Sequence, residues 1–184
     1  MPDQLLWYTA RGAGAVSLVL LTAVLVLGVL SSLRYRFAGR PRFLTTGFHR
    51  NLALVTVAFL ALHIVTAVVD PFTNLGWVSA IVPFSSYYRT FWLGLGTIAM
   101  ELFVALIVSS LLRASIGNRT WKFIHWVAYA AWPVAVVHGL GTGTDAWAVW
   151  FFALTCACIG AAGFAVVYRL IEDPVDPAPM QRAR

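Results

Sequence analysis

The stretch WKFIHWVAYAAWPVAVVHGLG, residues 121–141, is apolar enough to cross a bilayer as a helix, yet it carries two histidines, His125 and His138. Of the chain's 184 residues, 60% are hydrophobic and 11% are charged, which leaves too few polar side chains to cover a soluble globule. Five apolar stretches are close to the roughly 20 residues that span the hydrocarbon core as a helix. They are roughly Ala15 to Leu33, Leu52 to Val69, Phe91 to Leu112, Ile124 to Leu140 and Trp147 to Leu170. The sequence therefore predicts an all-α integral membrane protein, a bundle of five transmembrane helices.

The basic residues predict the orientation of this bundle. Of the 13 lysines and arginines, only Arg11 and Arg89 fall on one side if the five helices alternate in direction. Because cytoplasmic loops carry the excess of positive charge, we expect the N-terminus outside and the C-terminus in the cytoplasm. The net charge of +6 is explained by this bias and by attraction to anionic lipid, so we expect no nucleic-acid partner.

The chain shows a single predicted domain. We assign residues 1–171 to the membrane domain and residues 172–184, EDPVDPAPMQRAR, to a disordered cytoplasmic tail. The first apolar stretch is too long for a signal peptide and is kept as a spanning helix. Cys156 and Cys158 have neither CxxC nor CxxCH spacing, so we interpret them as small buried or lipid-facing residues.

All four histidines of the chain fall on two of the predicted helices. His49 and His63 belong to the second, and His125 and His138 to the fourth, and these two helices run in the same direction. At 1.5 Å per residue, the fourteen positions between the first pair span about 21 Å and the thirteen between the second pair about 20 Å. The histidines are therefore expected at two matching depths, one near each face of the membrane.

Two imidazoles at each depth predict two haem groups. They are too few for tetrahedral zinc, but they match the two axial positions of a haem whose porphyrin supplies the other four nitrogens. A straight helix turns through about 220° in thirteen residues, which would point His125 and His138 in different directions. We expect a kink at Pro133 to correct this difference.

The segments HRNLALVTVAFLALH, His49 to His63, and HWVAYAAWPVAVVH, His125 to His138, resemble the paired-histidine helices of the ferric reductase transmembrane domain. This family includes iron reductases, NADPH oxidases and the haem subunit of bacterial methionine sulfoxide reductase systems, and the similarity extends from about Leu6 to Leu170. It implies two haem b groups, an inner one on His49 and His125 and an outer one on His63 and His138. The chain has one helix fewer than the larger oxidases and lacks their flavin and nicotinamide domain, which implies that FAD or FMN acts only through a partner.

Several other residues are candidates for contact with the haems. Arg50, Arg113, Arg119 and Lys122 fall where inner propionates would emerge, and Arg89 with Tyr87 and Tyr88, or Arg11, would serve the outer ones. The positive-inside rule explains the inner cations equally well. Trp132 lies midway between the two depths, where it either packs between the haems or fills the core. Glu101, a carboxylate near the middle of a span, is expected to face the bundle.

These observations predict a cell-membrane cytochrome that carries electrons to an external acceptor such as ferric iron or a redox protein. The donor is expected to be a separate flavoprotein or a quinol, because bis-histidine haem accepts single electrons and a nicotinamide delivers a hydride. Two alternatives remain open: a quinol-oxidising respiratory cytochrome b subunit, and a haem-free membrane scaffold whose histidines only pack. An absorption spectrum separates the last alternative from the others.

Overall fold

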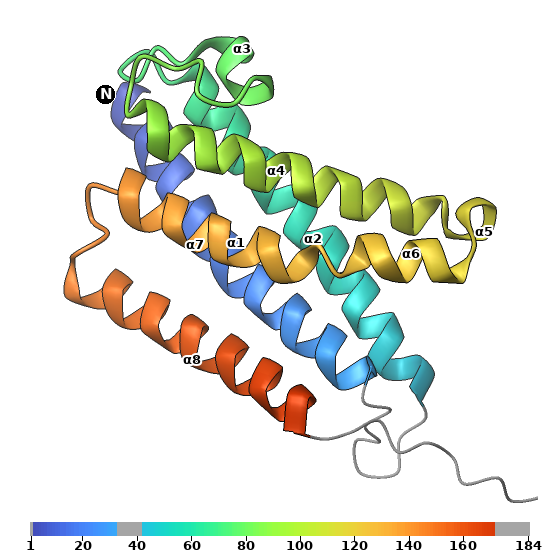
Figure 1. The fold of residues 1–184 in the computed structure, drawn as a ribbon. Helices are drawn as coiled ribbons and strands as arrows, with labels where there is room; N and C mark the ends of the chain where they lie inside the picture. Colours follow the sequence, from blue (N-terminus) through green and yellow to red (C-terminus); the bar gives the residue numbers. More distant parts are fainter. Residues whose placement is uncertain (1, 33–41, 172–184) are drawn as a thin grey trace, which may run out of the picture.

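The computed structural model describes residues 2–32 and 42–171, and the regular elements in that part of the chain are all helices. Five helical spans in this part of the chain are long and apolar enough to cross a membrane, which confirms a multi-pass membrane protein. The predicted tail, residues 172–184, lies outside the described residues. The elements are α1 Pro2–Ser32, α2 Arg42–Val69, α3 Gly76–Ile81, α4 Thr90–Leu111, α5 Arg113–Ile116, α6 Asn118–His125, α7 Ala128–Thr142 and α8 Val149–Ile171 (Figure 1).

Two helices begin well before the apolar stretches from which they were predicted. Helix α1 begins at Pro2 and α2 at Arg42, about three to four helical turns earlier than expected. Hydropathy marks only the residues that suit hydrocarbon, whereas a helix continues through the interface, where polar and aromatic side chains are favoured. His49 therefore lies inside α2, in its third turn.

The fourth span is interrupted directly after His125. Helix α6 ends at His125, α7 begins at Ala128, and the two residues between them form a turn. Pro133 lies inside α7 and not at the interruption, so the kink expected at Pro133 stays a prediction. The break at Trp126 and Val127 separates the helices that carry the two histidines, which lets each ring take its own direction.

The bundle is built from two helix pairs and one additional helix. Helix α1 packs along α2, α4 packs along α6 and α7, and α8 packs on α1 (Figure 1). Helix α2 makes no extensive backbone contact with α4 or α7, so the backbones of the two pairs are held apart. The core connects α1, α7 and α8 and contains Leu21, Trp132, Val136, Cys158 and Ala162.

Several threonine hydroxyls inside the spans are satisfied locally. Thr22, Thr56 and Thr155 each donate to the carbonyl oxygen four residues earlier, at 2.8 to 2.9 Å. Such bonds remove the cost of an unpaired hydroxyl in hydrocarbon without requiring a partner helix. Cys156 is exposed and Cys158 is buried, both as free thiols, as the sequence predicted.

Candidate functional site

The structure brings the four histidines together as two facing pairs. The ring centroids of His49 and His125 are 6.2 Å apart, and those of His63 and His138 are 6.3 Å apart. Within each pair one ring comes from α2 and the other from the fourth span, at the depths that the sequence predicted. Their role as ligands stays a prediction at this point.

These separations match two imidazoles on opposite sides of one metal ion. A ring nitrogen lies about 1.1 Å from its centroid and imidazole–metal bonds are about 2.0–2.1 Å, which places the two centroids about 6.3 Å apart. A direct hydrogen bond between the rings would bring them about 1 Å closer, and neither pair makes one. No cluster of three or more His, Cys, Asp or Glu side chains occurs in residues 2–32 and 42–171. Each pair therefore fits a metal whose remaining ligands come from a bound group, as in haem.

Three of the four rings are fixed by the backbone of a neighbouring helix. Nδ1 of His49 lies 3.0 Å from the carbonyl oxygen of Val24. Nδ1 of His63 lies 2.6 Å from the carbonyl oxygen of Ala10, and Nδ1 of His138 lies 2.8 Å from that of Trp92. Because a carbonyl oxygen only accepts hydrogen bonds, each of these Nδ1 atoms carries the proton. The other ring nitrogen, Nε2, then holds the free lone pair that a metal requires.

A cavity of about 810 Å3 lies at the level of His63 and His138. Its volume is within the range of about 300–1,000 Å3 that is usual for ligand sites. Most of its wall is apolar and comes from α1, α2, α4 and α7, with contributions from the loops at the same end. Ser17 lines the cavity, and its buried Oγ has no hydrogen-bond partner. The space suits a largely apolar group with a few polar atoms.

The two candidate cations at this end have different surroundings. Arg11 lines the cavity and forms an ion pair with Asp145 at 3.0 Å, and it also donates to the hydroxyl of Thr144. Arg89 does not line it, and its guanidinium donates to the carbonyl oxygen of Gly141 at 2.6 Å. Arg11 is thus the better candidate for contact with a bound acidic group, although sequence reasoning gave it no priority.

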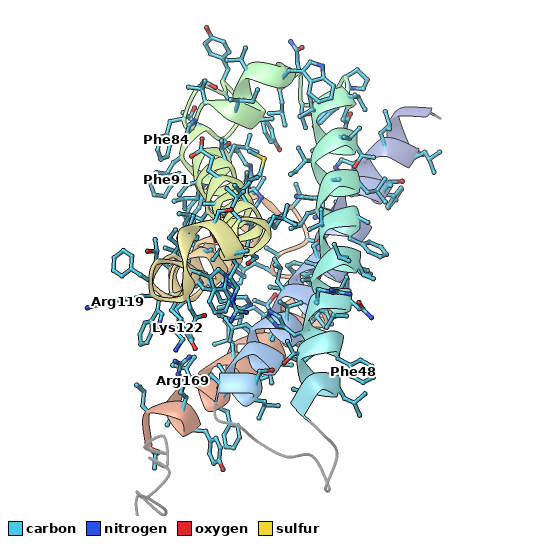
Figure 2. The ribbon with its side chains drawn as sticks, turned by 90° about the vertical axis from the view of Figure 1, so that its right-hand side faces the viewer. Phe48, Phe84, Phe91, Arg119, Lys122 and Arg169 are labelled. Carbon is cyan, nitrogen blue, oxygen red and sulfur yellow. The ribbon has the colours of Figure 1, made fainter. Side chains whose placement is uncertain are left out.

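At the other end, only Arg113 among the four candidate cations is linked to a histidine. Its guanidinium lies 4.1 Å from the ring centroid of Trp121, and Trp121 stacks on His125 with centroids 4.8 Å apart. Like Arg113, the other three cations, Arg50, Arg119 and Lys122, are exposed. Figure 2 shows Arg119 and Lys122 on the outer surface of the bundle, towards the same end as Arg169 and opposite to Phe84 and Phe91. These three cations do not converge on the histidine pair.

Of two residues predicted to lie inside the bundle, the structure buries one and exposes the other. Trp132 is buried, and its indole N–H donates to the Thr22 hydroxyl of α1 at 3.0 Å, which places it in the packed core. Glu101, in contrast, is exposed on α4, so our expectation that it faces the bundle was wrong. The adjacent turn of α4 presents Gly96 and Met100 to the cavity, and a residue one position further along points about 100° away.

Sequence comparison identifies the family. The family model described as ferric reductase like transmembrane component matches residues 13–136, about two thirds of the chain. The chain belongs to this family. The match covers three of the four histidines and ends two residues before His138. Searches of curated proteins and of solved structures found no match. As a ferric reductase-like transmembrane protein, the chain is assigned to electron transfer in the membrane.

Proposed function

We propose that this ferric reductase-like protein is a di-haem b cytochrome that transfers electrons across the membrane. The observation that carries the proposal is the presence of two facing imidazole pairs, with centroids 6.2 and 6.3 Å apart, at two depths of the same bundle. His49 and His125 would hold the inner haem, and His63 and His138 the outer one. Held between two imidazoles, a haem would supply single-electron exchange and would leave no coordination position for oxygen or a substrate.

The surrounding residues support this role by fixing the ligands and excluding water. The carbonyl oxygens of Val24, Ala10 and Trp92 hold three of the rings in the tautomer that presents Nε2. The apolar wall of the cavity keeps the outer level dry, which favours electron exchange without proton uptake from bulk water. Arg11 offers a guanidinium to an acidic substituent at the mouth of the cavity.

A partner flavoprotein or a membrane quinol would supply the electrons. A nicotinamide delivers a hydride, and a flavin is needed to divide it into single electrons. Residues 2–32 and 42–171 contain no strand, and so no βαβ unit for a dinucleotide lies among them. We place the donor on the cytoplasmic side, next to His49 and His125, and an acceptor such as ferric iron or a redox protein outside.

Haem quantification tests the central proposal. A pyridine haemochrome assay on the purified full-length protein should give two haems b per chain. His63→Leu, His138→Leu and the double variant should each keep one haem, because both residues serve the same outer group. His49→Leu and His125→Leu should each remove the other one and keep the outer haem.

Elution volume and far-UV circular dichroism confirm that each variant is folded. A wild-type protein without haem would contradict the proposal and favour a scaffold. A double variant with less haem than either single variant would contradict the pairing.

Reduction kinetics test the need for a donor. In liposomes, the protein should stay oxidised with NADH or NADPH alone and become reduced when a flavin reductase is added. A decyl-quinol arm distinguishes the quinol from the flavoprotein as donor. Rapid reduction by NADPH without a second protein would contradict the assignment of a partner.

A further inference from the structure

Three of the four histidines share one local arrangement with a neighbouring helix. In each case a glycine faces the imidazole ring, and Nδ1 donates to the carbonyl oxygen that lies four residues before that glycine. The sets are Gly28 and Val24 for His49, Gly14 and Ala10 for His63, and Gly96 and Trp92 for His138. Because the glycines lie on α1 and α4 and the histidines on α2 and α7, the arrangement recurs on different helix pairs.

The spacing of four residues has a physical reason. A helical side chain leans towards the N-terminus and covers the turn that precedes its own Cα. In an α-helix, the carbonyl oxygen four residues earlier accepts the glycine's own N–H. Without a Cβ on the glycine, this oxygen is open from the side, and its second lone pair can accept a proton from an imidazole. The glycine therefore supplies both the space for the ring and access to its acceptor.

The clearances show that an added methyl group would overlap the ring at Gly96 and would be tight at Gly14 and Gly28. A Cβ at Gly14 would lie 3.0 Å from Nδ1 of His63, and one at Gly96 would lie 2.5 Å from Cε1 of His138. At Gly28 the corresponding distance, to Cε1 of His49, is 3.3 Å, which is tight. The helical glycines Gly47 and Gly160 differ, because a Cβ at either position would meet nothing within 4 Å.

The fourth histidine is held in another way. The Nδ1 atom of His125 is buried and has no hydrogen-bond partner. At the corresponding depth α4 carries Ser109, which is buried and whose hydroxyl donates to the carbonyl oxygen of Leu106 at 3.0 Å. Ser109 is thirteen residues after Gly96, the same separation as between His125 and His138, so the position equivalent to Gly96 carries a side chain. His125 is oriented by its stacking on Trp121.

We propose that Gly14, Gly28 and Gly96 are positioning residues, each of which opens a backbone carbonyl that fixes a histidine with Nδ1 protonated and Nε2 presented to its partner ring. This inference rests on the proposed ligand role of the histidines for its haem readout. Its second readout, the protonated nitrogen of each ring, does not depend on that role.

Alanine substitutions test the proposal in the full-length protein. Gly14→Ala and Gly96→Ala should lower the haem content from two to one per chain, with loss of the outer haem. Gly28→Ala should weaken the inner haem, with a smaller loss because its clearance is larger. Gly47→Ala and Gly160→Ala should keep two haems, because alanine in an open helical position is favoured over glycine by about 0.5–1 kcal/mol.

Nitrogen NMR of 15N-histidine-labelled protein in nanodiscs gives the second readout. The wild type should show Nδ1–H for His49, His63 and His138, and Gly14→Ala should remove this signature from His63 alone. If Gly14→Ala and Gly96→Ala keep both haems and an unchanged Nδ1–H signature, the positioning role is overturned while the haem assignment stands. A wild type without haem that still shows the three Nδ1–H signals would overturn the haem assignment and leave the positioning role in place. If these rings instead carry the proton on Nε2 in the wild type, the positioning role is overturned without use of any variant.

Discussion

Arg11 and Asp145 place opposite charges at the wall of the outer cavity, and each charge should affect the outer site with its own sign. A nearby cation stabilises an added electron. Arg11→Gln should therefore lower the outer midpoint potential and weaken retention of the outer haem, by about 1 kcal/mol or about 40 mV for one electron. Asp145→Asn breaks the same ion pair but keeps the cation, so it should raise this potential.

Redox titration followed by the absorbance of the reduced haem measures both shifts. Arg89→Gln is the matched control, because its guanidinium is bound to the Gly141 carbonyl and does not line the cavity. Equal shifts for Arg11→Gln and Arg89→Gln would show that only the overall charge at this end matters.

Trp132 should stabilise the fold without affecting the absorption spectrum of the haems. Trp132→Phe and Thr22→Val remove the same hydrogen bond, of 3.0 Å, from an apolar core. Each substitution should lower the free energy of unfolding by about 1–3 kcal/mol and the thermal midpoint by several degrees. The haem absorption bands should stay unchanged. Because the two residues share one bond, the double variant should lose less than the sum of the single losses. A shift of the haem bands in Trp132→Phe would instead place the indole in contact with a haem.

At the scale of residues, the sequence was informative where the residue type itself carries the chemistry. Four histidines at matching depths were recognisable because imidazole is rare in a membrane helix and ligates metals. The glycines beside them were not, since glycine is common in membrane helices. The separation of Gly14 from Gly28 equals that of His49 from His63, and this was the available signal. The outward direction of Glu101 followed from the rotation of α4, which hydropathy does not fix.

At the scale of elements, Gly117 connects α5 to α6 and should determine the placement of His125. Its φ of 77° and ψ of 159° belong to a region that is essentially restricted to glycine. Gly117→Ala should cost about 1–3 kcal/mol and change how α6 enters the bundle, with selective loss of the inner haem.

Gly76→Ala is the control for this prediction, because Gly76 also has a positive φ, of 65°, but it begins α3 in the loop between α2 and α4. It should destabilise the protein to a similar extent and leave both haems bound. Haem content and thermal unfolding are measured on the same samples. Loss of the outer haem in Gly117→Ala would contradict the proposed role of α6.

The number of spanning elements could be predicted from the sequence, but their interruptions could not. Five apolar stretches of sufficient length indicate five spans regardless of packing. The break after His125 has no glycine or proline of its own, and Pro133 lies inside α7. It depends on the packing of α6 against α4, which hydropathy does not describe. Helix α3 was also missed, because its six residues are too few to show a period.

At the scale of the whole molecule, the orientation in the membrane stays a prediction from the basic residues. Tyr87 is fully exposed in the loop between α2 and α4, and it offers a site for labelling. In intact cells, Tyr87→Cys should react with a membrane-impermeant maleimide, because the basic ends of α6 and α8 are expected in the cytoplasm. The wild type is the control, since Cys156 and Cys158 lie within the α8 span. Labelling of Tyr87→Cys only after lysis would reverse the topology and the proposed direction of electron flow.

The order in which the helix pairs are made has a consequence for biogenesis. Helices α1 and α2 are consecutive, and so are the helices from α4 to α7, so each group can assemble soon after it leaves the ribosome. Helix α8 is synthesised after both groups and packs on α1, which is synthesised first. Until then, the side of Leu21 that later meets Cys158 and Ala162 contacts lipid tails, which are as apolar as the missing helix. Exposure of this α1 surface before α8 is synthesised therefore costs little free energy in the bilayer. In water, the same exposed surface would be prone to aggregation.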